Sequence, residues 1–332
     1  MPGRFPAGPG GVGRQREDGR RILAPLIRPS PLLTLLLVAG PLACATGPVV
    51  RPTLSSGVTP VAVAPKASRD AGALRVMTFN IQSGLRGLER VAEVIRAEAP
   101  DVVALQEVDV GSTRAGGQDQ VERLSALTGL KYRAHFGTTK LYGGHYGIAL
   151  LSRYPLESLA QYPLPTPRGA EPRTLAHAVL DVDGREVSVY ATHLIRRPFN
   201  GSARVRQSVF IANLLAKDPR PRLLMGDLND DPDSRPVRLL RRQLQDVAKV
   251  THADGKGTYP MPLFLPSLRI DYVMACGAFT PVSSRVLNVG ASDHFPVVAD
   301  LLLEPAAASK VASGAPAPAP DAATTTAAAA AP

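Results

Sequence analysis

The segment Leu223–Pro232, with the sequence LLMGDLNDDP, restricts the fold and chemistry of this chain more than any other stretch. Leu223–Met225 is typical of the end of a buried strand, and the following Gly226 permits a tight backbone turn. Asp227 and Asn229 then leave the strand on the same side. Because a buried carboxylate without a partner costs roughly several kcal/mol, a strand that delivers one favours a metal site or a reaction. Taken alone, an ordinary Asp/Asn turn is the simpler interpretation.

The same arrangement, an apolar strand with a polar side chain at one end, recurs in five other segments. They deliver Asn80 after Leu74–Phe79, Glu107 after Asp101–Gln106, His193 after Glu186–Thr192, Asp271 within Arg269–Met274, and Asp293-His294 before Phe295–Leu301. Strands bounded in this way bring their polar ends to one edge of a sheet, where binding sites form. Six such segments in one domain are hard to explain as turns alone.

Other segments have the spacing of helices and hairpins. Apolar residues recur with helical spacing over 88–97, 120–127 and 202–216. The strands 174–182 and 186–192 are joined by Asp-Gly, which is a strong hairpin signal. A further strand is predicted over 147–155, where a proline stops it.

The first 45 residues have the features of an export signal. Arginine-rich residues 14–28 precede the apolar run 32–39 and the small residues 42–45. The run is too short to span a membrane as a stop-transfer helix. Cys44 stands where a bacterial lipoprotein carries its lipid anchor. We therefore expect an exported protein, with either lipid attachment at Cys44 or plain cleavage beside it. The periplasm, the outer membrane and the medium all remain open as destinations.

The rest of the chain divides into a tether, one domain and a tail. Residues 46–73 lack any helical or strand period, and residues 305–332 are Ala/Pro-rich, so both are expected to be disordered. Residues 74–304 suffice for one domain with a sizeable core. The whole chain has a formal charge of +10, but this domain has a net charge of only +4. The basic composition is therefore not by itself a sign of nucleic-acid binding.

Six short motifs occur in order along the domain: Thr78-Phe79-Asn80, Gln106-Glu107, Thr192-His193-Leu194, Gly226-Asp227-Leu228-Asn229, Ile270-Asp271-Tyr272 and Ser292-Asp293-His294. Together they resemble the motif series of the endonuclease/exonuclease/phosphatase superfamily, which includes deoxyribonuclease I. The resemblance implies an α/β fold, a four-layer sandwich of two packed mixed β-sheets flanked by helices. It also implies Mg²⁺-dependent hydrolysis of a phosphate ester, with Mn²⁺ as the alternative metal.

The resemblance also assigns the metal ligands and a histidine–carboxylate pair. Mg²⁺ prefers hard oxygen ligands and usually takes only one or two protein carboxylates. Glu107 is the expected ligand, with Asn80 and Asp293 close to it. His294 is expected to pair with Asp271, whose carboxylate favours the imidazolium form. The sequence leaves open whether His294 acts as a base or as a cationic stabiliser.

Four further residues are expected to handle the water and the phosphate. The resemblance gives Asp227 the task of orienting or deprotonating the attacking water, and Asn229 that of holding water or a phosphate oxygen. His193 is expected to donate a hydrogen bond to a phosphate oxygen. Arg173 is a candidate for contact with the phosphate, because the family often has an arginine on that strand. Hydrolysis of a phosphate ester requires these functions in any enzyme.

Two classes of function stay open. The first is an exported hydrolase, and the second is a catalytically idle binding module with the same fold. The complete set of motif residues favours the enzyme. A phosphodiester is the expected substrate and a phosphomonoester the alternative. Nucleic acid, a phospholipid headgroup and a small diester all fit, although the chain contains no Trp for base stacking. A monomer is expected.

Overall fold

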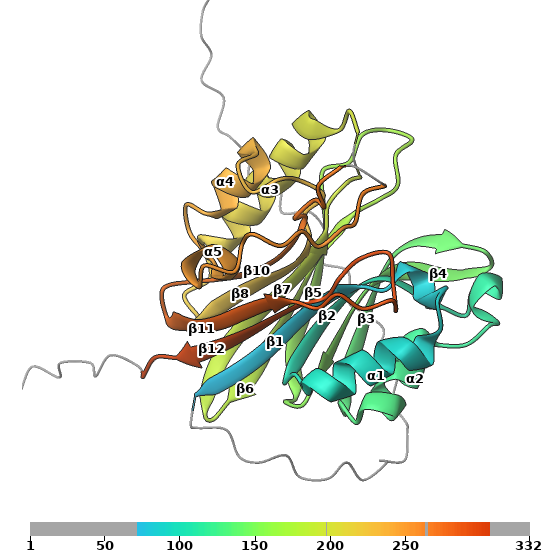
Figure 1. The fold of residues 1–332 in the computed structure, drawn as a ribbon, viewed down its shortest axis with the longest axis horizontal. Coiled ribbons are helices and arrows are strands. Elements are labelled where there is room, and N and C mark those ends of the chain that lie inside the picture. Colours follow the sequence, from blue (N-terminus) through green and yellow to red (C-terminus); the bar gives the residue numbers. More distant parts are fainter. Residues whose placement is uncertain (1–71, 197, 263–264, 306–332) are drawn as a thin grey trace, which may run out of the picture. The chain divides into compact units, whose positions relative to one another are not determined.

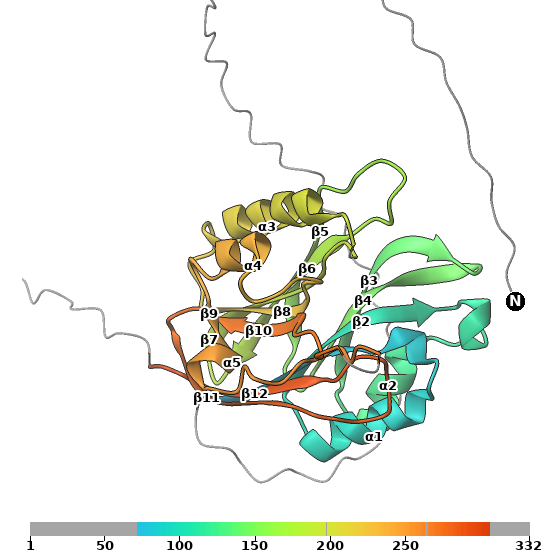
Figure 2. The same ribbon diagram turned by 45° about the horizontal axis from the view of Figure 1, so that its top comes forward.

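The computed structural model describes residues 72–196, 198–262 and 265–305. These residues form two six-stranded mixed sheets that pack face to face, with helices on the outer faces (Figures 1 and 2). This is the four-layer α/β sandwich that the sequence motifs imply. The predicted signal peptide, nearly all of the tether and the tail after residue 305 lie outside the described residues, so those assignments stay predictions.

The first sheet has the strand order β11-β12-β1-β2-β4-β3. Its strands are β1 (Ala73–Asn80), β2 (Val102–Val110), β3 (Tyr132–Leu141), β4 (Gly144–Ser152), β11 (Phe279–Val286) and β12 (Val297–Leu303). Only β1 and β2 run parallel to each other. The helices α1 (Leu88–Glu98) and α2 (Gln120–Thr128) cover the outer face, and the short 3-10 turns η1 (Gln82–Gly84) and η2 (Thr113–Ala115) follow β1 and β2.

The second sheet has the strand order β5-β6-β7-β8-β10-β9. Its strands are β5 (Leu156–Pro163), β6 (Thr174–Val182), β7 (Arg185–His193), β8 (Arg222–Asp227), β9 (Gln245–Asp246) and β10 (Asp271–Ala275). β7 and β8 are the parallel pair of this sheet. The helices α3 (Gly201–Leu215) and α4 (Arg235–Leu240) and the short α5 (Val247–Val250) lie on its side of the sandwich.

The two-residue period of the strands divides the core into two parts. In β1, Leu74 and Val76 pack into the large cluster that both sheets share, whereas Met77 and Phe79 pack under α1 and α2. Asn80 therefore lies on the face of β1 that is turned toward the other sheet. At roughly 25 cal/mol per Å² of apolar surface, burial of this alternating set is the main force that fixes the register.

The three helices expected from the sequence form, with boundaries shifted by only a few residues. Asp119 precedes α2 and accepts hydrogen bonds from the backbone amides of Val121 and Glu122, so it is a typical N-cap. Gly129 ends the helix with a φ of 72°, a conformation that suits glycine. The spacing of apolar residues along the sequence did not predict α4 or α5, which have only six and four residues.

Two further properties concern membrane spans and the cysteine of the domain. Within the described part of the chain, none of the helices has the length and apolar character needed to cross a membrane. Cys276 is buried and forms no disulfide.

Candidate active site

The register of the second sheet places three predicted site residues side by side. His193 at the end of β7 pairs with Asp227 at the end of β8, and Asp271 at the start of β10 pairs with the same Asp227. Registered neighbours in adjacent strands present their side chains on the same face. The sheet therefore delivers an imidazole and two carboxylates in one row, all of them buried.

The first sheet supplies Asn80 and Glu107 opposite this row. Glu107 points into the site only because the pairing of β2 with β4 is irregular at this position. Val102, Ala104 and Gln106 follow the two-residue period on the inner face of β2, so the next residue would point outward under the helices. The β2–β4 pairing shifts register between Gln106 and Val108, and Glu107 has a φ of 59°. This bulge turns the Glu107 side chain toward Asn80.

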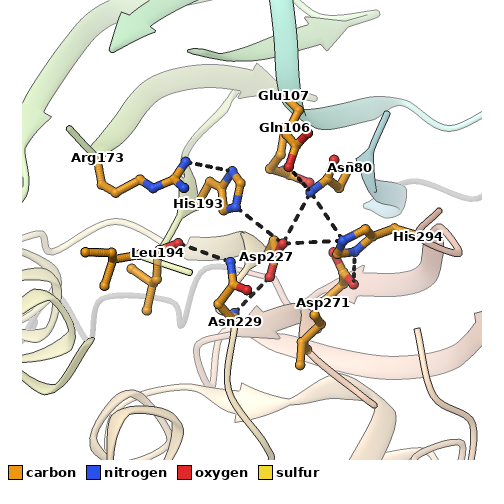
Figure 3. Close-up of polar contacts among 12 residues, drawn as sticks. Asn80, Gln106, Glu107, Arg173, His193, Leu194, Asp227, Asn229, Asp271 and His294 are labelled. Atoms are coloured by element: carbon orange, nitrogen blue, oxygen red, sulfur yellow. Dashed lines mark hydrogen bonds and ion pairs between the residues drawn. The ribbon is translucent and has the colours of Figure 1, made fainter. Parts of the chain in front are cut away.

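Asn80 connects the two sheets (Figure 3). Its Nδ2 atom donates to Glu107 Oε1 at 3.1 Å and to Asp227 Oδ2 at 3.3 Å, and lies 3.5 Å from His294 Nε2. Its Oδ1 atom accepts the backbone N–H of Gln82 at 3.1 Å. The amide nitrogen of Asn80 thus faces the carboxylates, and its oxygen faces the turn after β1.

The loop after β8 has a conformation that locks Asp227 and Asn229. Gly226 has a φ of 144°, and a side-chain Cβ at this position would lie 1.9 Å from the carbonyl oxygen of Thr192, so only glycine fits. Asn229 has a φ of 51°, and its backbone N–H donates to Asp227 Oδ1 at 2.8 Å. The Asn229 side chain donates to the carbonyl oxygen of Leu194 at 3.2 Å, which ties the loop to the residue after His193.

His294 is held by Asp271. Its Nδ1 atom lies 2.9 Å from Asp271 Oδ2, and its Nε2 atom lies 3.8 Å from Asp227 Oδ2. The ring of Tyr259 packs against it at a centroid distance of 4.9 Å. Burial by itself lowers the pKa of His294, but the adjacent Asp271 carboxylate outweighs this and raises the pKa to about 10. The expected pair is therefore present, and it favours the imidazolium form.

His193 has the opposite environment. Its Nδ1 atom lies 3.1 Å from Arg173 Nη1, and its Nε2 atom lies 3.4 Å from Asp227 Oδ2. Complete burial, together with the Arg173 guanidinium, holds the pKa of His193 well below its usual range. Arg173 also forms an ion pair with Glu171, with 3.0 Å between Nη1 and Oε1.

Two of the carboxyl groups have raised pKa values. Burial raises the pKa of Asp227, and the neighbouring Asp271 carboxylate raises it further. Burial also raises the pKa of Glu107, against the hydrogen bond from Asn80. A carboxyl group whose pKa lies near neutrality suits a general base better than an ordinary aspartate does.

A divalent metal ion fits this concentration of acidic groups. Ligand atoms of Asp227, Asp271 and His294 lie within 4.8 Å of one another, and the two carboxylates concentrate negative charge there, although an imidazolium His294 has no lone pair for a metal. Asp271 Oδ1 is buried without a hydrogen-bond partner, as expected where a cation completes the site. The predicted ligands border the same cluster. Among the described residues, Glu107 accepts a side-chain hydrogen bond only from Asn80, and the nearby negative charge of Asp293 raises the pKa of Glu107 further.

The structure brings all the predicted site residues into one region, and it adds some that the motifs did not reveal. The buried Ser292 hydroxyl donates to the carbonyl oxygen of Asn80, and Thr258 Oγ1 accepts the backbone N–H of Asp271. Tyr146 lines a shallow hollow beside Arg173 and His193. Ser292 belongs to a quoted motif and was open to prediction, whereas Thr258 and Tyr146 have no sequence signal.

The region that holds these residues is similar to known proteins. A family model described as the Endonuclease/Exonuclease/phosphatase family matches residues 77–294. A solved endonuclease/exonuclease/phosphatase from Beutenbergia cavernae has a TM-score of 0.58 and 31% identity, over 70% of this chain and 72% of that one. The structure of TDP2 from C. elegans has a TM-score of 0.56 and 20% identity, over 70% of this chain and 77% of that one.

Two curated proteins are also similar to this chain. YbhP from Escherichia coli is 27% identical and is matched over 69% of this chain and 96% of its own length. The protein cwh43 from Schizosaccharomyces pombe is 28% identical over 46% of this chain, but the match spans only 15% of that much longer protein.

Proposed function

This chain belongs to the Endonuclease/Exonuclease/phosphatase family, whose members are generally metal-dependent hydrolases of phosphate esters, and we propose that it is an exported phosphodiesterase that uses Mg²⁺ or Mn²⁺. One observation carries the proposal. Asn80 Nδ2, His193 Nε2 and His294 Nε2 all face a single carboxylate oxygen, Asp227 Oδ2, at 3.3, 3.4 and 3.8 Å. The site is complete, because every position that the motifs require has the expected residue.

Asp227 is the base in this proposal. Its Oδ1 atom accepts the backbone N–H of Asn229, which fixes the orientation of the carboxylate that takes the proton from the attacking water. The raised pKa of Asp227 lets it take up that proton near neutral pH. Asn229 holds the loop in place, and its amide lies at the same edge as the water and the phosphate.

The two histidines stabilise charge on the phosphate from opposite sides of Asp227. His294, paired with Asp271, contributes a positive charge, and His193 contributes a hydrogen bond. Charge that develops on the non-bridging oxygens is the main obstacle in phosphate-ester hydrolysis, so fixed donors at these positions lower the barrier.

A bound divalent cation would supply charge neutralisation at the phosphate and orientation of water. Glu107 and Asp293 are the ligands we propose, with Asn80 beside them. The carboxylates of Asp227 and Asp271 already accept hydrogen bonds from Asn229 and His294, whereas Glu107 accepts one only from Asn80 among the described residues. Glu107 therefore keeps one carboxylate oxygen available to a cation.

The edge that carries the site also carries exposed apolar side chains, which support a phospholipid headgroup over bare nucleic acid. Leu85 follows β1, Tyr142 lies in the β3–β4 turn, and Phe199 follows β7; their exposed fractions are 61%, 55% and 98%. The sheet topology places all three at the edge where β1, β2 and β7 end. Large apolar side chains gathered at a site edge are typical of contact with an apolar partner.

The experiment that tests the proposal is a hydrolysis panel with Mg²⁺ and with Mn²⁺. It contains plasmid DNA, RNA, sphingomyelin, phosphatidyl lipids, inositol phosphates and bis-p-nitrophenyl phosphate. Hydrolysis of a diester that stops on addition of EDTA is expected, and it should be lost in Glu107→Gln but kept in Glu89→Gln, a matched change at an exposed position on α1. Inactivity on every member of the panel, together with Mg²⁺ binding, would support an idle binding module. Preference for the inositol phosphates would support a phosphomonoesterase.

Export and anchoring are tested separately. Cys44 is the proposed lipid attachment point, so labelling of cells with a radioactive fatty acid should mark the wild-type protein and not Cys44→Ser. Recovery of both proteins unlabelled and soluble in the periplasm would leave plain cleavage as the mode of export.

A further inference from the structure

Arg173 is enclosed at the site in a way that leaves it little freedom to reach a substrate. Only 5% of its side chain is exposed. Its Nη1 atom lies 3.1 Å from His193 Nδ1 and 3.0 Å from Glu171 Oε1, and its Nη2 atom lies 3.4 Å from Glu171 Oε2. Both terminal nitrogens are thus engaged with the protein.

The contact between Arg173 and His193 fixes where the imidazole carries its proton. A guanidinium has only N–H donors and no acceptor. His193 Nδ1 must therefore accept the hydrogen bond through its lone pair, which means that it carries no hydrogen. A neutral imidazole has one N–H group, so the hydrogen of His193 is on Nε2, the atom that faces Asp227 Oδ2 at 3.4 Å.

His294 provides the contrast within the same site. Its Nδ1 atom faces a carboxylate, which accepts hydrogen bonds, so Nδ1 carries a hydrogen. Figure 3 shows the resulting order, Arg173–His193–Asp227–His294–Asp271, with the two imidazoles on either side of one carboxylate. The Arg173 guanidinium contacts His193, whereas the Asp271 carboxylate contacts His294. The two rings therefore have different protonation states.

We propose that Arg173 is a positioning residue that holds His193 as the neutral Nε2–H tautomer, a fixed hydrogen-bond donor directed at Asp227 and at the phosphate bound beside it. The part of this inference that concerns the phosphate rests on the proposed function, whereas the tautomer does not. Burial and the Arg173 guanidinium both lower the pKa of His193, in agreement with this assignment. Arg173 thus acts on the substrate through His193 rather than by direct contact.

The first test is nuclear magnetic resonance of protein labelled with ¹⁵N in the histidine rings, recorded without metal near neutral pH. The chain has six histidines, and the spectrum of His193→Gln identifies the signals of His193. The wild type should show a protonated Nε2 and an unprotonated Nδ1. Arg173→Lys, which keeps a donor-only cation, and Glu171→Gln, which leaves the guanidinium in place, should show the same pattern. Arg173→Met should give a mixture of tautomers.

Two results of this experiment would overturn the proposal. One is a wild-type His193 that is protonated at Nδ1. The other is an unchanged His193 pattern in Arg173→Met, because the arginine would then not set the tautomer. Should Arg173→Met fail to fold, judged by circular dichroism, the wild-type spectrum and that of Arg173→Lys still decide the question.

The second test uses kinetics and separates positioning from substrate binding. Arg173→Met should lower kcat roughly 10- to 100-fold with KM nearly unchanged, as when a histidine loses the partner that orients it. Arg173→Lys should recover most of the rate. Arg173→Met combined with His193→Ala should be no slower than His193→Ala alone. A raised KM with additive losses would assign Arg173 to direct phosphate contact. Absence of any hydrolysis would count against the proposed function and leave the spectroscopic result intact.

Discussion

His177 is the residue from which the pH dependence of stability can be worked out most directly. It lies on β6, and its ring stacks on Tyr190 with the centroids 4.3 Å apart. Its Nε2 atom is 3.1 Å from Ser188 Oγ and 3.8 Å from Asp218 Oδ2. Burial lowers the pKa of His177 from 6.5 to about 4, although Asp218 opposes the change. The folded protein therefore favours the neutral ring.

The sign of the effect follows from linkage. As the pH falls below 6.5, the imidazole of His177 becomes protonated in the unfolded chain. In the folded protein the same imidazole stays neutral until the pH reaches about 4. The stabilisation is thus complete above 6.5 and is lost between 6.5 and 4. The full loss is about 3 kcal/mol at ~1.36 kcal/mol per pKa unit, and the portion lost between pH 7 and pH 5 is about 2 kcal/mol.

The perturbation is His177→Phe, which keeps a stacked ring and removes the proton site. Ser188 retains a partner in this variant, because its hydroxyl also hydrogen-bonds Asp218. Urea unfolding of both proteins at pH 7, 6 and 5 measures the effect. Other titrating groups, such as the half-buried His135, are present in both proteins and cancel in the difference. The wild type should lose about 2 kcal/mol more than the variant between pH 7 and pH 5. An equal loss of unfolding free energy in the two proteins between pH 7 and pH 5 would refute the reasoning.

Three further perturbations test the site and the fold. Glu107→Gln should reduce hydrolysis by orders of magnitude while leaving the metal-free melting temperature unchanged or raised, because burial disfavours the charged carboxylate; full activity would exclude Glu107 as a metal ligand. His294→Ala should lose as much activity alone as together with Asp271→Asn, because the two side chains act as a unit; additive losses in a double-mutant cycle would contradict this. Gly226→Ala should destabilise the protein by roughly 3 kcal/mol or more in urea unfolding, because its Cβ would collide with the Thr192 carbonyl; near-wild-type stability would show that the close approach is absent.

Local sequence patterns were sufficient for α1, α2 and α3 and for the strands that form the centre of each sheet. β1, β2, β7 and β8 have buried apolar runs, and the polar residue at the end of each run stands out against them. β3, β5 and β11 were not predicted. They lie at or next to sheet edges, where one side of the strand is half exposed, so polar and apolar residues mix without a clear period.

Most of the predicted site residues belong to short motifs at strand ends, which is why the sequence pointed to them. The contacts among these residues could not be predicted from the sequence. The register of β7, β8 and β10 places His193, Asp227 and Asp271 in one row, and the packing of the two sheets brings Asn80 to within 3.3 Å of Asp227. These residues come from segments far apart in the chain, and nothing local encodes their distance.

Two features depended on the tertiary structure alone. The period of β2 directs Glu107 away from the site, and only the bulge in the β2–β4 pairing turns it back. The sequence made Arg173 a candidate for phosphate contact, and only the structure shows that its Nη1 atom contacts both Glu171 and His193. A sequence determines which side chains are present and the local period that they follow. The partner of each polar group, and with it the position of its proton, is determined by which strands pair and how the two sheets pack, because hydrogen bonds depend on distances that only the assembled fold sets.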